Sequence, residues 1–96
     1  MNTMELLESK REEILRIAKE HGANNIRIFG SVARGEANEQ SDIDFLVEFE
    51  PGTSLLTHSS LIVALEDLLG CKVDVAPEKT LKNRIRQRVI SEALPL

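Results

Sequence analysis

The segment that begins at Ser41 most constrains the fold, because polar and apolar side chains alternate along it. Four apolar residues alternate with four that are mostly charged: Ile43, Phe45, Val47 and Phe49 against Asp42, Asp44, Leu46 and Glu48. Alternation over four to eight residues is typical of a half-buried strand, whose successive side chains point to opposite faces. We therefore predict a strand over residues 41–49, with an apolar face toward a core and both aspartates on the other face.

Asp42 and Asp44 are two positions apart on this strand. A strand rises about 3.3 Å per residue, so the two residues lie roughly 6.5 to 7 Å apart along the chain. Their carboxylate oxygens can therefore converge on shared cations. Mg²⁺ is the natural occupant, because one or two carboxylates commonly hold it while water and substrate phosphates complete its shell. A calcium-binding loop is disfavoured, since Phe45 and further apolar residues follow the acids and no turn glycine does.

A third carboxylate, Asp74, lies in a second short segment with strand character, residues 71–77. Val73 and Val75 form the apolar face of this segment, and Asp74 falls on the opposite face. If the segment pairs beside residues 41–49, at the usual strand spacing of about 4.8 Å, Asp74 joins the first two carboxylates on the open face. Three carboxylates suffice to hold two metal ions. Taken alone, Asp74 also fits a structural aspartate at a sheet edge.

The run that starts at Ile26 is rich in β-branched residues and ends at Gly30, after which Ser31 begins a short helical turn. Glycine permits a tight turn, and the backbone N–H groups together with the serine hydroxyl can donate to an anion. Phosphate oxygens are the anion that we expect there. Arg34, about one helical turn further on, either adds a charge-assisted contact to a triphosphate or forms a surface ion pair.

Together these residues resemble a known family. Gly30-Ser31, ten intervening residues, Asp42-x-Asp44 and the later Asp74 are similar to the motif of the minimal nucleotidyltransferases in the DNA polymerase β superfamily. The resemblance implies that the glycine–serine pair holds nucleotide phosphates and that the three aspartates bind two Mg²⁺ ions. It also implies that Asp74 helps to activate the attacking hydroxyl.

The same resemblance implies a function. Small members that look like this chain are commonly the antitoxin of a pair whose toxin is an all-helical HEPN ribonuclease, and they transfer AMP from ATP to a toxin hydroxyl, typically that of tyrosine. The chain itself contains no tyrosine, which excludes self-modification on that residue. Two alternatives remain. One is an antitoxin that neutralises its partner by binding alone, and the other is the nucleotide-binding subunit of a two-chain transferase for small molecules.

The remaining sequence predicts a helix over residues 4–20, a second over 54–69, and a last helix after Pro77 that Thr80 caps. The order becomes helix, strand, short helix, strand, helix, strand, helix. Such alternation predicts an α/β fold with a small mixed sheet and helices packed on one of its faces. A chain of 96 residues is long enough for one core, so we expect a single domain over residues 1–96.

The last helix combines an apolar stripe with a basic surface. The residues expected to face inward are Leu81, Ile85, Val89 and Ala93. The basic residues in and just before the helix are Lys79, Lys82, Arg84, Arg86 and Arg88. They fit either a solvated helix face or a docking surface for an acidic partner. We expect residues 92–96 to fray at the end of the chain.

The overall composition narrows the classes of function. A net charge of −4 and an aromatic content of 3% disfavour a nucleic-acid-binding protein, which usually shows a basic surface and stacking aromatics. Cys71 is the only cysteine, so no internal disulfide forms, and we expect a small core or edge residue. His21 and His58 have no partner at metal-ligand spacing. No signal peptide or membrane-spanning run is visible, so we expect a cytoplasmic protein without a membrane partner.

Overall fold

A four-stranded mixed sheet organises the computed structural model, which describes residues 2–38 and 42–96. The elements in chain order are α1 (Thr3–Ser9), α2 (Arg11–Glu20), β1 (Ala23–Phe29), α3 (Gly30–Ala33), β2 (Ile43–Phe49), α4 (Leu55–Leu69), β3 (Val73–Pro77), the 3₁₀ turn η1 (Glu78–Thr80), α5 (Asn83–Glu92) and β4 (Leu94–Pro95). The strands lie in the order β3-β2-β1-β4. β2 runs parallel to β3 and antiparallel to β1, and β4 runs antiparallel to β1. The predicted α/β fold with a small mixed sheet is confirmed. Ser41, where the predicted strand begins, lies outside the described residues.

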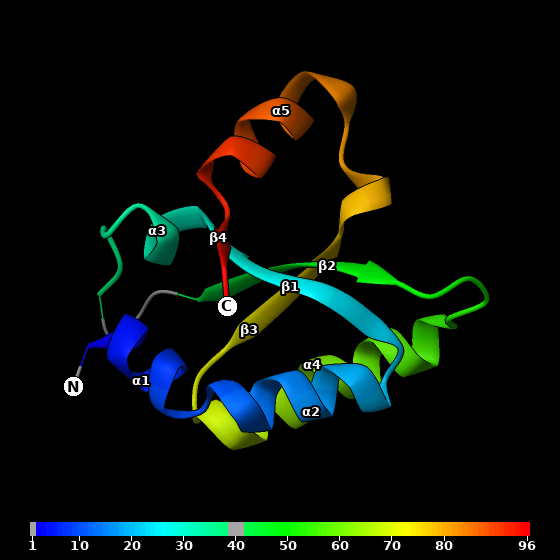
Figure 1. Cartoon of the computed structure of the whole chain (residues 1–96), viewed down its shortest axis with the longest axis horizontal. Helices are drawn as coiled ribbons and strands as arrows, with labels where there is room; N and C mark the ends of the chain where they lie inside the picture. The colour runs from blue at the N-terminus through cyan, green and yellow to red at the C-terminus, as the bar shows by residue number, and fades with distance from the viewer. Residues whose placement is uncertain (1, 39–41) are drawn as a thin grey trace.

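One face of the sheet carries the main core, which α2 and α4 cover (Figure 1). Ile43, Phe45 and Val47 of β2 are at most 1% exposed, as the alternation predicts. Val73 and Val75 of β3 belong to the same buried cluster. Burial of a large apolar side chain contributes about 1.5–3 kcal/mol, so this face supplies much of the stability of the fold.

The opposite face is not uniformly open. Leu46, which shares the parity of the aspartates, is fully buried. Neither Leu46 nor Val89 of α5 belongs to the main core cluster, although both are buried. α5 lies on the other side of the sheet from α2 and α4 (Figure 1). The face that the strand pattern predicts to be open is therefore partly covered, because η1 and α5 return over it after β3, which a strand pattern alone does not reveal.

The N-terminal segment forms two helices instead of the single predicted helix over residues 4–20. Lys10 leaves the helical conformation, with φ −106° and ψ 9°. Its N–H donates back to the Leu6 and Leu7 carbonyls at 3.1 and 3.3 Å, which closes α1. The break lets Leu7 of α1 and Ile14 of α2 both reach the core, where each is fully buried. The burial of both side chains thus outweighs the propensity of this segment to form one continuous helix.

The two ends of α4 match the prediction. The Ser54 hydroxyl accepts a hydrogen bond from the Thr57 N–H at 3.1 Å, as an N-cap does. Gly70 ends the helix in the left-handed conformation, with φ +70°. Among the described residues, no helix is long and apolar enough to cross a bilayer.

The last helix begins later than predicted, and Thr80 does not cap it. The Thr80 hydroxyl donates to the Pro77 carbonyl at 2.9 Å within η1, while α5 starts at Asn83 without a side-chain cap. Of the four residues expected to face inward, only Val89 is buried, and the other three are half-buried. The backbone is extended at Leu81 and Lys82, so the helix starts at Asn83 and Leu81 lies outside it.

The expectation that the C-terminus frays is also wrong. β4 pairs with β1 as an edge strand, with Leu94 opposite Ile28. The Leu96 N–H donates to the Ile26 carbonyl at 3.1 Å, and the Leu96 side chain packs against the main core. The edge of β1 offers unpaired backbone groups that capture this tail.

Candidate active site

Asp44 and Asp74 lie directly opposite each other on neighbouring strands. β2 and β3 are parallel, and the register pairs Asp44 with Asp74. Residues paired in this way point to the same face of a sheet, so both carboxylates project away from the main core. Asp44 is half-buried and Asp74 is exposed. The predicted pairing of these strands is confirmed.

Asp42 immediately precedes β2 and completes a cluster of negative charge. The pKa of the Asp44 carboxyl is raised, first by burial and then by the negative charges of Asp74 and Asp42. The Arg34 guanidinium acts in the opposite direction on the same group. Asp42 and Asp74 therefore add to the effect of burial in disfavouring the charged form of Asp44, and the nearby Arg34 offsets part of this effect.

Gly30 brings the end of β1 against this cluster. Phe29 pairs with Asp44 in the antiparallel register of β1 and β2. Gly30 has φ +73°, and a Cβ atom at this position would collide with Oδ2 of Asp44 and lie 3.2 Å from its Cγ. The close approach of the turn and the carboxylate therefore requires glycine. Ser31, the second residue of α3, lies next to this contact, so the predicted turn and the predicted carboxylates meet at one end of the strands.

Arg34 adopts the surface ion-pair alternative. Its Nε donates to Glu36 Oε2 at 3.0 Å, and its Nη1 donates to Glu92 Oε2 of α5 at 3.3 Å. The hydrogen bond and charge of Glu36 raise the pKa of Arg34. A contact of Arg34 with a triphosphate stays a prediction, and it would require the guanidinium to exchange one of these carboxylates for phosphate.

The donor set fits Mg²⁺ in its chemistry. In the described part of the chain, no three carboxylate, imidazole or thiol side chains are arranged to hold a metal ion by themselves. Mg²⁺ does not need such a group, because one or two carboxylates together with water and substrate phosphates commonly bind it. Carboxylates beside a glycine turn that accepts no side chain match this mode of binding.

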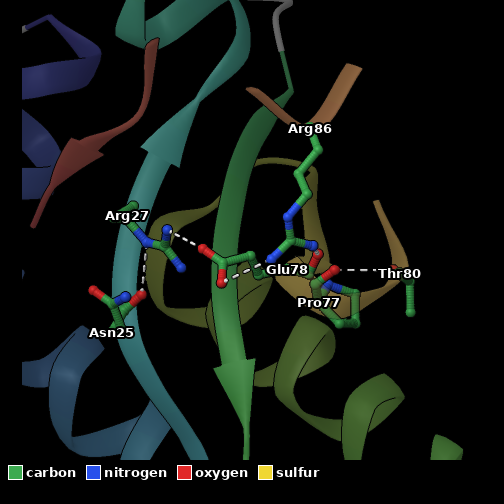
Figure 2. Close-up of polar contacts among 6 residues, drawn as sticks. All are labelled: Asn25, Arg27, Pro77, Glu78, Thr80 and Arg86. Carbon is green, nitrogen blue, oxygen red and sulfur yellow. Dashed lines mark hydrogen bonds and ion pairs between the residues drawn. The ribbon is translucent and has the colours of Figure 1, made fainter. Parts of the chain in front are cut away.

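Sequence reasoning missed a polar cluster around Arg27 and Glu78, which Figure 2 shows. Arg27 pairs with Leu46 of β2, so it lies on the face of the sheet that carries Asp44. Arg27, only 8% exposed, donates to Glu78 Oε1 at 2.6 Å and to the Asn25 carbonyl at 3.1 Å. Arg86 of α5 donates to the Glu78 carbonyl at 2.9 Å, and its Nη2 lies 3.6 Å from Glu78 Oε2. The hydrogen bond from Arg27 lowers the pKa of Glu78. A lone arginine inside an apolar run was the available signal.

The other singled-out side chains have structural partners. His58 Nε2 lies 2.7 Å from the Val75 carbonyl oxygen, and its ring lies 5.2 Å from the ring of Phe49. His21 Nδ1 lies 2.7 Å from the Ile17 carbonyl oxygen. Cys71 is half-buried against the core, and burial raises the pKa of its thiol, which disfavours a role as nucleophile.

Comparison with known proteins finds a matching family model and relatives of similar length. The family model described as "Nucleotidyltransferase domain" matches residues 11–96. The chain is 40% identical over 99 residues to the protein adenylyltransferase MntA of Thermococcus cleftensis, covering 98% of this chain and 96% of that protein. It is 52% identical to a solved structure described as "putative minimal nucleotidyltransferase", with a TM-score of 0.87 and coverage of 96% of this chain and 94% of the other.

A more distant structure shares the fold. One chain in the complex of a tri-AMPylated Shewanella oneidensis HEPN toxin with an MNT antitoxin matches with a TM-score of 0.70 at 18% identity. The match covers 92% of this chain and 69% of that chain. With a family model that spans most of its length and a relative of the same size at 40% identity, this chain belongs to the nucleotidyltransferase domain family, as a minimal nucleotidyltransferase.

Proposed function

We propose that this protein is a Mg²⁺-dependent protein adenylyltransferase that acts as an antitoxin. It transfers AMP from ATP to a hydroxyl group, with tyrosine as the expected acceptor, on a partner HEPN ribonuclease toxin. The observation that carries the proposal is the meeting of Asp44, Asp74 and Gly30 at one end of the strands. That end of the sheet combines a carboxylate pair with a turn suited to phosphate.

The proposed reaction is a substitution at the α-phosphorus of ATP. The acceptor oxygen forms a bond to the α-phosphorus, the bond from this phosphorus to the bridging oxygen breaks, and pyrophosphate leaves with the bonding electrons. Gly30 and Ser31 hold the phosphates, and Arg34 adds a charge contact to them. Asp74, exposed beside Asp44, is the candidate that accepts the hydroxyl proton. Asp42, Asp44 and Asp74 would hold Mg²⁺, which would supply activation of the hydroxyl and neutralisation of charge on the phosphates.

The electrostatics of the cluster favour catalysis over neutralisation by binding alone. The raised pKa of Asp44 shows that its negative charge is disfavoured in the fold. In the absence of a cation, the ionised Asp44 carboxylate thus costs stability, and a protein that only binds its partner has no need to retain such a group. The names of the relatives support the same choice, since MntA of Thermococcus cleftensis is called a protein adenylyltransferase.

We propose that residues 1–96 form a single catalytic unit, that the protein works in the cytoplasm, and that it binds neither nucleic acid nor membranes. The two-chain transferase for small molecules is the less favoured possibility, because no described feature points to a small-molecule acceptor.

Intact-mass analysis of the adjacent gene product tests the proposal. The product is incubated with this protein, Mg²⁺ and each nucleoside triphosphate in turn, and the double variant Asp42→Asn/Asp44→Asn serves as the control. We expect a mass gain of one or more AMP groups with ATP and no gain with the control. Peptide mapping then identifies the acceptor hydroxyl.

Other outcomes would contradict specific parts. A tight complex without any mass change would show that the protein neutralises its partner by binding and not by AMP transfer. A gain with another nucleotide would retain the transferase and change the donor. If the double variant were as active as the wild type, Asp42 and Asp44 would not be part of the active site.

A further inference from the structure

The outward face of α4 is the least protected apolar surface among the described residues. Leu56 is 79% exposed and Val63 is 55% exposed. A shallow groove on this face is lined by Leu56, Ser59, Ser60, Val63, Ala64 and Asp67, which we call the outer stripe. On a helix of 3.6 residues per turn, the outer stripe lies opposite the buried residues Leu61, Leu65 and Leu69. α4 therefore presents large apolar side chains, Leu56 and Val63, on its outer face as well as on its inner face, a pattern expected of a helix with neighbours on two sides.

The outer stripe has the shape of a helix-packing surface. Its large side chains, Leu56 and Val63, alternate with the small side chains of Ser59, Ser60 and Ala64. Small residues let two helices approach closely, and large ones fill the grooves between turns. The first three turns of the outer stripe carry no charge, so packing there separates no ion from water.

The distribution of charge along α4 favours a second copy of the same helix as the partner of the outer stripe. The first turn of the helix has no acidic residue and the last turn has no basic residue. Asp67 lies near the C-terminal end, where a carboxylate is unfavourable with respect to the helix dipole. Within residues 2–38 and 42–96, the side chain of Asp67 makes no hydrogen bond or ion pair. A second α4 running antiparallel would bring its N-terminal turn beside Asp67, and the reverse contact would form at the other end.

We propose that the outer stripe of α4 packs against the same stripe of a second copy of this chain, in an antiparallel two-fold dimer. The register that places Asp67 beside Leu56 of the second copy also places Ser60 opposite Val63, so a large residue meets a small one. Because a two-fold contact is reciprocal, each favourable pair occurs twice.

This arrangement is compatible with the candidate active site and does not depend on the proposed reaction. α4 covers the face of the sheet that carries Phe45, whereas Asp44 and Asp74 project from the other face. Both candidate sites of the dimer therefore stay open to solvent. The outer stripe is only about 17 Å long at 1.5 Å per residue, so it is smaller than a standard interface of about 800 Å² per partner. We accordingly expect a dimer that dissociates on dilution.

Sedimentation and light scattering of the full chain over a range of concentrations test the proposal. We expect a mass that rises from 10.7 kDa toward twice that value. Val63→Glu should raise the dissociation constant roughly 100-fold or more, because each dimer would bury two unpaired charges. Ile90→Glu, at a position on α5 that is 38% exposed, is the matched control and should leave the dimer intact. A wild-type chain that is monomeric throughout, or equal effects of both substitutions, would overturn the proposal.

Cysteine cross-linking tests the antiparallel geometry and remains informative if Val63→Glu does not fold. In a Cys71→Ser background, Ser60→Cys places the two thiols about 4.5 Å apart along the axis, within reach of a disulfide. Leu56→Cys places them about 16 Å apart, which is too far. We expect an oxidised dimer with Ser60→Cys alone. Cross-linking through Leu56→Cys, or through neither position, would contradict the antiparallel dimer.

Discussion

The two faces of the sheet divide stability from chemistry, although the same strand contributes to both. On β2, Phe45 is fully buried under α2 and α4, while its neighbour Asp44 projects from the other face. That other face is itself divided. Its carboxylates lie at one end, Leu46 is buried in the middle, and the Arg27–Glu78 pair lies toward the end of β3. A sheet of this size can therefore carry an unfavourable charge cluster because its opposite face and its far end stabilise it.

The pKa shifts on the polar face have opposite directions at its two ends. The pKa of Asp44 is raised by burial and neighbouring carboxylates, so its ionised form is disfavoured. The pKa of Glu78 is lowered by Arg27, so its ionised form is favoured. On the same face, ionised Asp44 thus lowers the stability of the fold, whereas ionised Glu78 raises it. The dependence of stability on pH should distinguish the two groups.

Phe45→Ala should have the largest effect, because it removes the central side chain of the core face. Truncation of a buried phenylalanine costs about 3–5 kcal/mol through lost burial and a residual cavity. Leu46→Ala, on the adjacent residue of the polar face, should cost less, about 2 kcal/mol, since Leu46 lies outside the main cluster. Urea unfolding measures both. Equal costs would show that the two faces contribute similarly to stability.

Gly30→Ala should reduce AMP transfer about 100-fold, because the new Cβ would displace the Asp44 carboxylate. Gly35→Ala is a matched control, since Gly35 has the same φ of +73° but nothing within 4 Å of a Cβ atom. Both variants should lose about 1 kcal/mol of stability from backbone strain. Transfer rates per folded molecule separate the two effects. Similar transfer rates for both variants would show that the contact between Gly30 and Asp44 is not needed for the reaction.

Glu78→Gln should lower the free energy of unfolding by about 2–3 kcal/mol, because it leaves the buried Arg27 guanidinium without a counter-ion. Arg86→Gln, at a more exposed position, should cost less than about 1 kcal/mol. The stabilisation by Glu78 is present above its ordinary pKa of 4.5 and is lost as the pH falls through its lowered pKa. The wild type and Glu78→Gln should therefore converge in acid, as unfolding curves at several pH values would show.

Asp44→Asn should have the smallest effect on stability, and in the opposite direction. A raised pKa means that the fold prefers the protonated carboxyl, so the wild type loses stability as the pH rises from the ordinary value of 3.8 through the raised value. At pH 7 the variant should be more stable by about 0.5 kcal/mol, after allowance for solvent screening. At pH 3 the two proteins should unfold alike. A variant that is less stable at pH 7 would show that Asp44 does not bear an unfavourable charge.

The local patterns of the sequence predicted much of the candidate site. Alternation predicted the opposite faces of Phe45 and Asp44, and the parity of the second strand predicted that Asp74 would share the face of Asp44. The glycine at position 30 predicted the turn that approaches these carboxylates. Strand parity and turn chemistry are local properties, so a single sequence is enough to reveal them. The roles of these residues in catalysis stay predictions.

Contacts between distant segments were decided only by the tertiary structure. Arg27 and Glu78 are 51 positions apart, and Arg34 and Glu92 are 58 apart, so no local pattern pairs them. The capture of Leu94 by the edge of β1 is likewise a tertiary event. The sequence by itself determined which residues alternate, turn and carry charge. The packing of α5 over the polar face decided which of them are buried and paired, because burial depends on what the rest of the chain brings alongside.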